Sequence, residues 1–128
     1  MADPISDMFI RIKNAQKAGH ESVQIPYSQL RYKIMKVMER AGFIGKVEKK
    51  GKRVKRVIEA PLIYKDGAPM VGGVRLLSKP GRRVYVSYRS LKPTIRLGTV
   101  ILSTSKGVMI SKEAQKEKVG GELIAEIW

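Results

Sequence analysis

The sequence has no cysteine, a single histidine and no long apolar run. Without cysteine there can be no disulfide and no thiolate metal site. No stretch reaches the roughly 18–20 apolar residues that a membrane-spanning helix needs. Asp3 and Asp7 lie near the start, so no basic segment precedes an apolar signal core. We therefore expect a cytoplasmic protein that has no membrane partner.

Acidic residues are also scarce, with 11 Asp and Glu against 26 Lys and Arg, which gives a formal net charge of +15. Residues 46–56 pack seven cations around one acid, and residues 67–111 contain no acid at all. Such an excess repels itself and is typical of proteins whose usual partner is a polyanion, because neutralised phosphates release counterions. The cations of the acid-free window are Arg75, Lys79, Arg82, Arg83, Arg89, Lys92, Arg96 and Lys106.

Motifs for catalysis are few. Ser103 and Lys106 match the S-x-x-K nucleophile motif of penicillin-binding proteins. That chemistry needs the serine at a helix start, together with S-D-N and K-T-G elements. Neither companion string occurs, and Gly107 argues against a helix. His20 has no carboxylate partner that can be named, and no phosphate-binding loop or metal-ligand spacing appears. We predict no enzyme, no cofactor, no metal and no small-molecule substrate.

The first half of the chain predicts two helices and three strands. The Asp3–Pro4 pair opens a helix that stops at Gly19, and a short strand ends at Pro26. Ser28 caps a second helix, which ends at the left-handed position of Gly42. Strands at 43–49 and 53–60 follow, joined by a turn at 49–52. The expected buried stripes are Ile5, Met8, Phe9 and Ile12, then Leu30, Ile34, Val37, Met38 and Ala41.

Turn residues without periodicity at 66–69 and 72–73 indicate a boundary between two small lobes, 1–66 and 67–128. The second lobe is mainly β, with a short helix from Ser111 to about Lys118 that Ser111 would cap. The fold class is therefore α+β, with an α-β-α-β-β first lobe. The strands expected in the second lobe are 74–77, 84–88, 99–103, 107–110 and 122–127.

Residues 78–85 form a candidate RNA contact. Their Pro-Gly pair predicts a tight turn that presents Lys79, Arg82 and Arg83, and Tyr85 follows at the start of the next strand. Cations that meet phosphates, beside a ring that can stack on an unpaired base, are a usual combination in RNA recognition. The alternative is a solvated basic hairpin in which Tyr85 is an ordinary half-buried strand residue.

A second candidate is a hydroxyl-rich turn, in which Ser103, Thr104 and Ser105 are followed by Lys106 and Gly107. Hydroxyls both donate and accept, so they can read base edges, phosphates or the 2′-OH. The glycine allows a ligand to come close to the backbone. The alternative is a hairpin turn whose hydroxyls bond only the local main chain.

Two further alternatives stay open. Pro80-Gly81-Arg82 is similar to the minor-groove arms of DNA-binding proteins, which would indicate a small architectural DNA-binding protein. Such a protein would have comparable affinities for DNA and RNA, and would be a dimer. Trp128, at the end of the last expected strand, either packs against the edge of the sheet or stacks on RNA.

Four strings together resemble a known family: residues 3–15, 78–85, 101–109 and 120–124. They read DPISDMFIRIKNA, SKPGRRVY, ILSTSKGVM and GGELI. In this order they closely resemble the bacterial-type family of the eighth protein of the small ribosomal subunit. The resemblance spans essentially the whole chain.

The resemblance implies a two-lobed α+β protein that binds the central domain of small-subunit ribosomal RNA and helps to assemble the platform of that subunit. Neighbouring small-subunit ribosomal proteins would be partners, as would its own messenger RNA, since some members repress their own operon. The expected contacts are Ser103, Thr104, Ser105, Lys106, Gly107, Tyr85, Lys79, Arg82, Arg83, Arg11, Lys13, Asn14 and, on charge alone, Lys55.

Overall fold

A computed structural model describes residues 3–91 and 98–128. Its helices and antiparallel strands confirm the α+β class. Contacts divide the chain into two compact units, 1–72 and 73–128. The sequence places the boundary earlier, between 66 and 67. Lys92 and Arg96 of the acid-free window lie outside the described residues.

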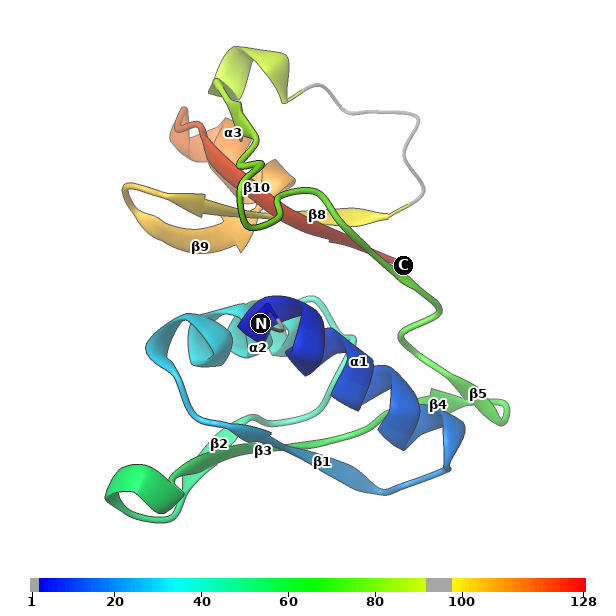
Figure 1. Ribbon diagram of the computed structural model, residues 1–128. Coiled ribbons are helices and arrows are strands. Elements are labelled where there is room, and N and C mark those ends of the chain that lie inside the picture. Colours follow the sequence, from blue (N-terminus) through cyan, green and yellow to red (C-terminus); the bar gives the residue numbers. More distant parts are fainter. Residues whose placement is uncertain (1–2, 92–97) are drawn as a thin grey trace. The chain divides into compact units, whose positions relative to one another are not determined.

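In the N-terminal unit, two helices cover one face of a three-stranded antiparallel sheet (Figure 1). The strand order is β1-β3-β2, so the last strand in sequence lies in the centre. A short 3-10 helix, η1, lies between the paired strands β2 and β3. The elements are α1 (Pro4–Lys17), β1 (Ser22–Pro26), α2 (Gln29–Arg40), β2 (Glu48–Lys50), η1 (Arg53–Lys55) and β3 (Val57–Pro61).

The caps predicted for both helices are confirmed. The Asp3 carboxylate accepts the N–H of Ile5 at 3.2 Å, and the Ser28 hydroxyl accepts the N–H of Arg31 at 3.1 Å. Gly42 has the left-handed φ of +87° that follows a helix end. Each cap satisfies a donor that the first helical turn leaves open. Local sequence alone therefore sets where both helices begin.

The predicted stripe of α1 is confirmed at its centre, whereas that of α2 is wrong at its ends. Leu30 is 43% exposed and Ala41 is also exposed, because they lie in the first turn and at the C-cap of α2. Met35, which was not expected, is fully buried instead. The buried residues are Met8, Phe9, Ile12, Ala15 and Gln16 in α1, and Ile34, Met35, Val37 and Met38 in α2.

The hairpin of β2 and β3 exists, but both of its strands begin later than predicted, and β2 begins at Glu48 rather than at residue 43. Strand pairing starts at Lys50 and Val57 rather than at residue 53. Residues 53–55 form η1, and Arg53 has a left-handed φ of +54°. The run 52–56 carries four cations, and like charges directly opposite in a strand pair are destabilising. A wider turn therefore replaces the expected strand start.

A small hairpin of β4 (Tyr64–Lys65) and β5 (Ala68–Pro69) was not predicted. Its turn residues Asp66 and Gly67 have φ of +54° and +80°. Positive φ at both central residues is what a two-residue hairpin turn requires, and Asp-Gly is a favoured pair for it. The signal was therefore present, although the flanking strands are too short to show a period.

In the C-terminal unit, four strands form the sheet order β6-β10-β8-β9, and β7 also pairs with β10. The core consists of Leu91, Val100, Leu102, Met109, Ala114 and Leu123. The elements are β6 (Val74–Leu76), β7 (Tyr85–Val86), the 3-10 helix η2 (Tyr88–Ser90), β8 (Thr99–Thr104), β9 (Gly107–Ile110), α3 (Ser111–Glu117) and β10 (Gly121–Ile127).

Most expected elements of this unit are confirmed, and β9 has the predicted bounds. Two details are wrong. Ser111 is the first residue of α3 and not its cap, because β9 runs directly into the helix and leaves Ile110 at the cap position. The strand expected at 84–88 is limited to Tyr85–Val86, since the chain turns into η2.

Candidate nucleic-acid interface

The sheet register of the C-terminal unit places Tyr85 and Ser103 in one row. Glu122 of β10 pairs with Tyr85 on one side and with Ser103 on the other. Paired residues of antiparallel strands point to the same face, and adjacent strands lie about 4.8 Å apart. The backbones of Tyr85 and Ser103 are therefore roughly 10 Å apart on a shared face. Tyr85 is 68% exposed, so the half-buried alternative for it is wrong.

The opposite face of these strands carries the core residues Leu102 and Leu123. Gly121 belongs to β10, which lies between β7 and β8 in the sheet. It occupies a position where a strand usually carries a side chain. A Cβ on this glycine would overlap the backbone oxygen of Ser103. Only glycine lets β10 and β8 approach so closely here, and it thereby fixes the position of Ser103 beside β10. The sequence contained the Gly-Gly string but not the register that explains it.

The hydroxyl-rich turn is a hairpin in which Thr104 pairs with Gly107 across a two-residue loop. The Thr104 hydroxyl donates to the Gly107 carbonyl at 2.8 Å and accepts the Lys106 N–H at 3.1 Å. The local main-chain alternative is thus correct for Thr104. Within the described chain, the hydroxyls of Ser103 and Ser105 form no hydrogen bond, and Ser105 is exposed. Those two hydroxyls can bind a ligand.

The geometry of this hairpin contradicts the S-x-x-K interpretation. Ser103 lies in strand β8, and the two-residue loop of a hairpin separates it from the next strand. A helix start, which that chemistry needs, is absent here. Among the described residues, no group of three or more His, Asp or Glu side chains could hold a metal ion. No described helix is long and apolar enough to cross a membrane.

The turn at 78–84 is held by the backbone and by one buried hydroxyl. Lys79 and Arg82 exchange two backbone hydrogen bonds, of 3.0 and 2.8 Å, and Gly81 has a φ of +79°. The buried Ser78 hydroxyl accepts the N–H of Val84 at 3.0 Å. This supporting role of Ser78 was missed, because a serine before a turn is equally common as a surface residue. The turn presents Lys79 and Arg82 to solvent.

Acidic residues partly neutralise the predicted cations of this unit. Arg83 pairs with Glu122 at 3.2 Å, and Lys106 pairs with Glu117 at 3.4 Å. Exposed pairs of this kind contribute little stability and exchange easily with a phosphate. Lys79 and Arg82, by contrast, have no acidic partner within the described residues.

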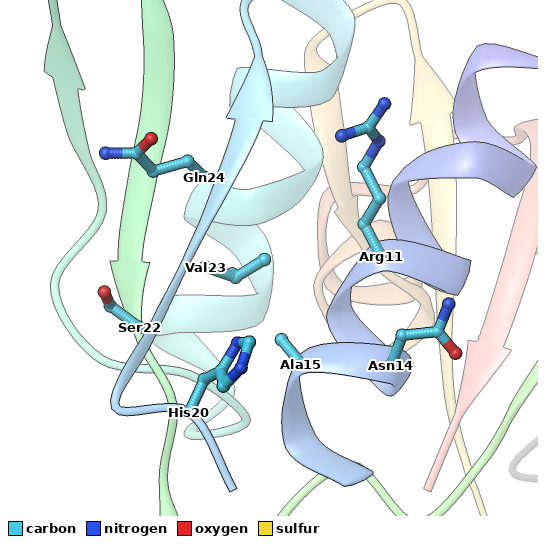
Figure 2. Close-up of a pocket in the computed structure, with 7 residues that line it drawn as sticks. All are labelled: Arg11, Asn14, Ala15, His20, Ser22, Val23 and Gln24. Carbon is cyan, nitrogen blue, oxygen red and sulfur yellow. The ribbon is translucent and has the colours of Figure 1, made fainter. Parts of the chain in front are cut away.

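The predicted residues of α1 line two hollows on the surface of the N-terminal unit. Arg11 and Asn14 line an open groove of about 480 Å³ between α1 and β1, together with the exposed His20 (Figure 2). Arg11 is paired with Asp7 at 2.8 Å. Lys13 borders a second hollow, beside residues 69–72, which Asn14 also lines. Asn14 can therefore contact a ligand group together with Arg11 in the first groove or together with Lys13 in the second.

Trp128 packs within its unit, which is one of the two alternatives that the sequence leaves open. A Cβ on Gly73 would overlap the indole ring, so the ring lies directly on this glycine. The two residues exchange backbone hydrogen bonds of 3.1 Å in each direction. The indole remains 48% exposed. The packing places the only tryptophan of the chain in the C-terminal unit, where it can serve as a spectroscopic probe.

The fold and this surface define a class: a small, strongly basic α+β protein that presents a ring, hydroxyls and cations from one sheet. The sequence model of the family "Ribosomal protein S8" matches residues 3–128. The chain belongs to this ribosomal protein family. It is a structural, non-enzymatic protein of the small ribosomal subunit, located with the ribosome in the cytoplasm.

Similar proteins carry the name "Small ribosomal subunit protein uS8". The one from Dictyoglomus turgidum is 43% identical over 129 residues, which cover 100% of this chain and 98% of the relative. The one from Mycoplasmopsis agalactiae is also 43% identical, with the same coverage. That from Anaeromyxobacter sp. is 44% identical over 128 residues, covering 98% of this chain and 97% of the relative.

Proposed function

We propose that this protein binds the central domain of small-subunit ribosomal RNA directly and supports assembly of the platform of that subunit. The observation that carries the proposal is the sheet register, which aligns exposed Tyr85 with Ser103 beside the free hydroxyl of Ser105. Family membership supports ribosomal RNA and neighbouring small-subunit proteins as partners.

The recognition is selective for RNA shape. The major groove of an A-form helix is too narrow for side chains, whereas the minor groove displays base edges and 2′-hydroxyls. Ser103 and Ser105 exchange hydrogen bonds with these groups, because a hydroxyl can donate and accept. The Tyr85 ring stacks on a base that an irregular helix leaves unpaired. A regular duplex offers no such base and binds less tightly.

The remaining predicted residues position or attract the RNA. Thr104 keeps the turn in shape through its internal hydrogen bonds, and Gly107 gives the RNA access to the backbone. Phosphates bind to the cations and to the polar residues of α1, which fix orientation without reading sequence. These residues are Lys79, Arg82, Arg83, Lys106, Arg11, Lys13, Asn14 and Lys55.

The test is the variant Ser105→Ala, measured on a fragment of the central domain and on a generic RNA duplex. We expect the affinity for the fragment to fall by roughly 1–3 kcal/mol, the range for one specific contact, with a far smaller loss for the duplex. Ser111→Ala removes a hydroxyl at the start of α3 and should change neither. Equal losses on both RNAs from Ser105→Ala would show that the turn does not read the RNA.

A competition of the same fragment against duplex DNA at physiological salt tests the architectural DNA-binding alternative. Preference for the RNA is expected, because the 2′-OH is part of the recognised surface. Comparable affinities would favour the DNA-binding protein.

We infer that the protein's own messenger RNA binds the same face, through a site that mimics the ribosomal one. Ser105→Ala should then weaken binding of the messenger RNA and binding of the ribosomal fragment to the same extent. A loss confined to the ribosomal fragment would remove self-repression from the proposal.

A further inference from the structure

Six of the seven cations at residues 46–56 of the N-terminal unit lie beyond Val47, and their different surroundings divide these six into two groups. We call residues 48–57, which comprise β2, η1 and the start of β3, the basic hairpin. Its closed end, at residues 51–56, lies beyond the end of the three-stranded sheet (Figure 1). Which of its cations are already engaged within the protein decides which can bind a ligand.

Aromatic rings hold two of these cations. The Lys49 ammonium lies 4.6 Å from the centre of the Tyr32 ring and 5.5 Å from that of Tyr27. The Arg56 guanidinium lies 5.3 Å from the centre of the Tyr27 ring. At these distances the negative face of the ring attracts the cation. Because the centres of the two rings are themselves 6.2 Å apart, the rings form one cluster that contacts a cation from each arm of the hairpin.

A carboxylate holds a third cation, Lys50, whose ammonium lies 2.6 Å from Glu59 across the strand pair. This hydrogen bond raises the pKa of Lys50. It also lowers the pKa of Glu59, which accepts a second bond from Gln24 at 2.9 Å. Lys50 is thus oriented along the sheet.

The base of the hairpin is fixed as well. Glu39 of α2 accepts the backbone N–H of Val47 at 2.7 Å, and this bond lowers the pKa of its carboxyl. Lys36 and the nearby charge of Lys46 lower it further. On the other strand, the Tyr27 N–H donates to the Arg56 carbonyl at 3.1 Å. Both arms therefore enter the closed end from anchored positions.

The closed end has a different character. Lys52, Arg53 and Lys55 are exposed and have no acidic or aromatic partner within the described residues. Between them Val54 is 98% exposed, the extreme among the exposed large hydrophobic residues. Gly51 packs so closely on the Lys55 carbonyl that a side chain there would overlap it. The turn is compact, and Arg53 holds a strained left-handed φ within it.

We propose that the closed end of the basic hairpin is a second, preorganised RNA contact. Lys52, Arg53 and Lys55 bind phosphates, and Val54 packs against a sugar or base between them. Lys49, Lys50 and Arg56 are positioning residues that do not touch the RNA. The inference rests on the proposed ribosomal RNA binding and adds a site to it.

The charge pattern favours RNA over a protein partner. A protein surface would have to supply three acids around one apolar pocket, whereas any nucleic-acid backbone provides phosphates on both sides of a groove. The minor groove of RNA is wide and shallow, so a blunt turn can enter it. Apolar side chains inserted at such positions pack against the bases in other nucleic-acid complexes. A fixed turn also loses little conformational entropy on binding.

The salt dependence of binding separates the two groups of cations. On the central-domain fragment, Lys52→Gln and Lys55→Gln should each reduce the slope of log K against log salt by about one unit. Lys49→Gln should leave that slope unchanged, because its charge contacts rings and no phosphate. Lys65→Gln, a cation of the other hairpin in the same unit, is the matched control and should also leave it unchanged. An equal reduction by Lys49→Gln would overturn the division.

The proposed contact of Val54 with RNA is tested by changing the size and polarity of its side chain. Val54→Ser should weaken the fragment about tenfold, the effect of losing one buried apolar side chain, whereas Val54→Ile should bind like the wild type. Neither change should alter the melting temperature, since the side chain has no neighbours to lose. If Val54→Ser binds as tightly as the wild type, Val54 does not enter the RNA.

These outcomes distinguish this site from the proposed function. If the hairpin variants bind normally while Ser105→Ala weakens the fragment, the second contact is wrong and ribosomal RNA binding stands. If the wild type does not prefer the fragment to a generic duplex, the proposed function itself fails. If the hairpin variants lose only a small-subunit protein in reconstituted particles, the site belongs to a protein partner and the inference is overturned.

Discussion

The two units present their basic surfaces by different physical means. In the C-terminal unit, the register of β7, β10 and β8 fixes the positions of Tyr85 and Ser103, and acids partly neutralise the cations beside them. In the N-terminal unit, rings and carboxylates hold the arms of the basic hairpin, and the cations at its closed end have no acidic or aromatic partner in the described part of the chain.

Under the proposed RNA binding, this difference corresponds to a division of labour between the units. The face with paired cations and unbonded hydroxyls would recognise shape, because its hydrogen bonds depend on geometry more than on ionic strength. The turn whose cations have no partner among the described residues would mainly add affinity, which salt weakens. The comparison also shows that net charge alone does not identify contacts, since Lys49 and Lys52 are both exposed lysines but have different surroundings.

The largest effect that tests this comparison should come from Gly121→Ala. The added methyl group would overlap the backbone of β8 at Ser103, so β10 and β8 would have to separate. We expect the free energy of unfolding to fall by about 3 kcal/mol, the upper range for overpacking, and RNA specificity to fall with it. Denaturant titration followed by Trp128 fluorescence measures the change in this unit.

Gly67→Ala is the control for losing a glycine as such. A Cβ there meets open space, although the φ of +80° is strained for alanine. A cost of about 1 kcal/mol is expected, without any change in RNA binding. If both substitutions cost the same, close packing at Gly121 does not fix the row of Tyr85 and Ser103.

The sequence could predict those parts of the fold that depend on neighbours in the chain. Asp3, Ser28 and Gly42 mark helix ends through bonds and dihedral angles within a few residues, and all three are confirmed. The start of β3 at Val57 was mispredicted, because the turn residues at 49–52 indicate a strand that begins directly after them. Only the opposing like charges and the contact of Gly51 with Lys55 exclude it, and both require the folded hairpin.

For the candidate site, the sequence predicted the residue types but not their grouping. The turn at Ser105 follows from its hydroxyls and Gly107, whereas its alignment with Tyr85 depends on β10, which is distant in sequence. The inward bonds of Thr104 could not be separated from ligand binding, because a hydroxyl serves either purpose. The cluster of Lys49 on Tyr32 is likewise visible only once α2 and β2 meet.

A smaller effect is expected from pH, since the base of the basic hairpin depends on a carboxylate. The Val47 N–H lowers the pKa of Glu39 below its ordinary 4.5, outweighing partial burial, which raises it. Below that ordinary value the unfolded chain binds the proton more readily than the folded one. The stabilisation is therefore complete at neutral pH and is lost as the pH falls through the lowered pKa.

Glu39→Gln should remove this dependence. At neutral pH the variant loses about 1 kcal/mol, the difference between a charged and a neutral acceptor. Its stability should change less than that of the wild type from about pH 6 to about pH 3, a range that includes the ordinary pKa of 4.5. Circular dichroism melting across that range measures it. A wild type and variant with parallel pH profiles would show that the carboxylate does not hold the hairpin.

The smallest effect is expected from replacing two cationic residues with a strained backbone, one in each unit. Arg53 and Lys118 both have a left-handed φ, of +54° and +56°. Glycine relieves this strain but gains entropy in the unfolded chain, so each replacement should stabilise by only about 0.5 kcal/mol. The two replacements should differ in their effect on RNA binding, because Arg53 lies at the closed end of the hairpin, where its charge is proposed to bind a phosphate. Arg53→Gly should therefore weaken RNA binding and reduce its salt slope, whereas Lys118→Gly, which ends α3, should gain stability alone. Equal losses of RNA affinity would mean that both units bind RNA through general charge, and the division between them would not hold.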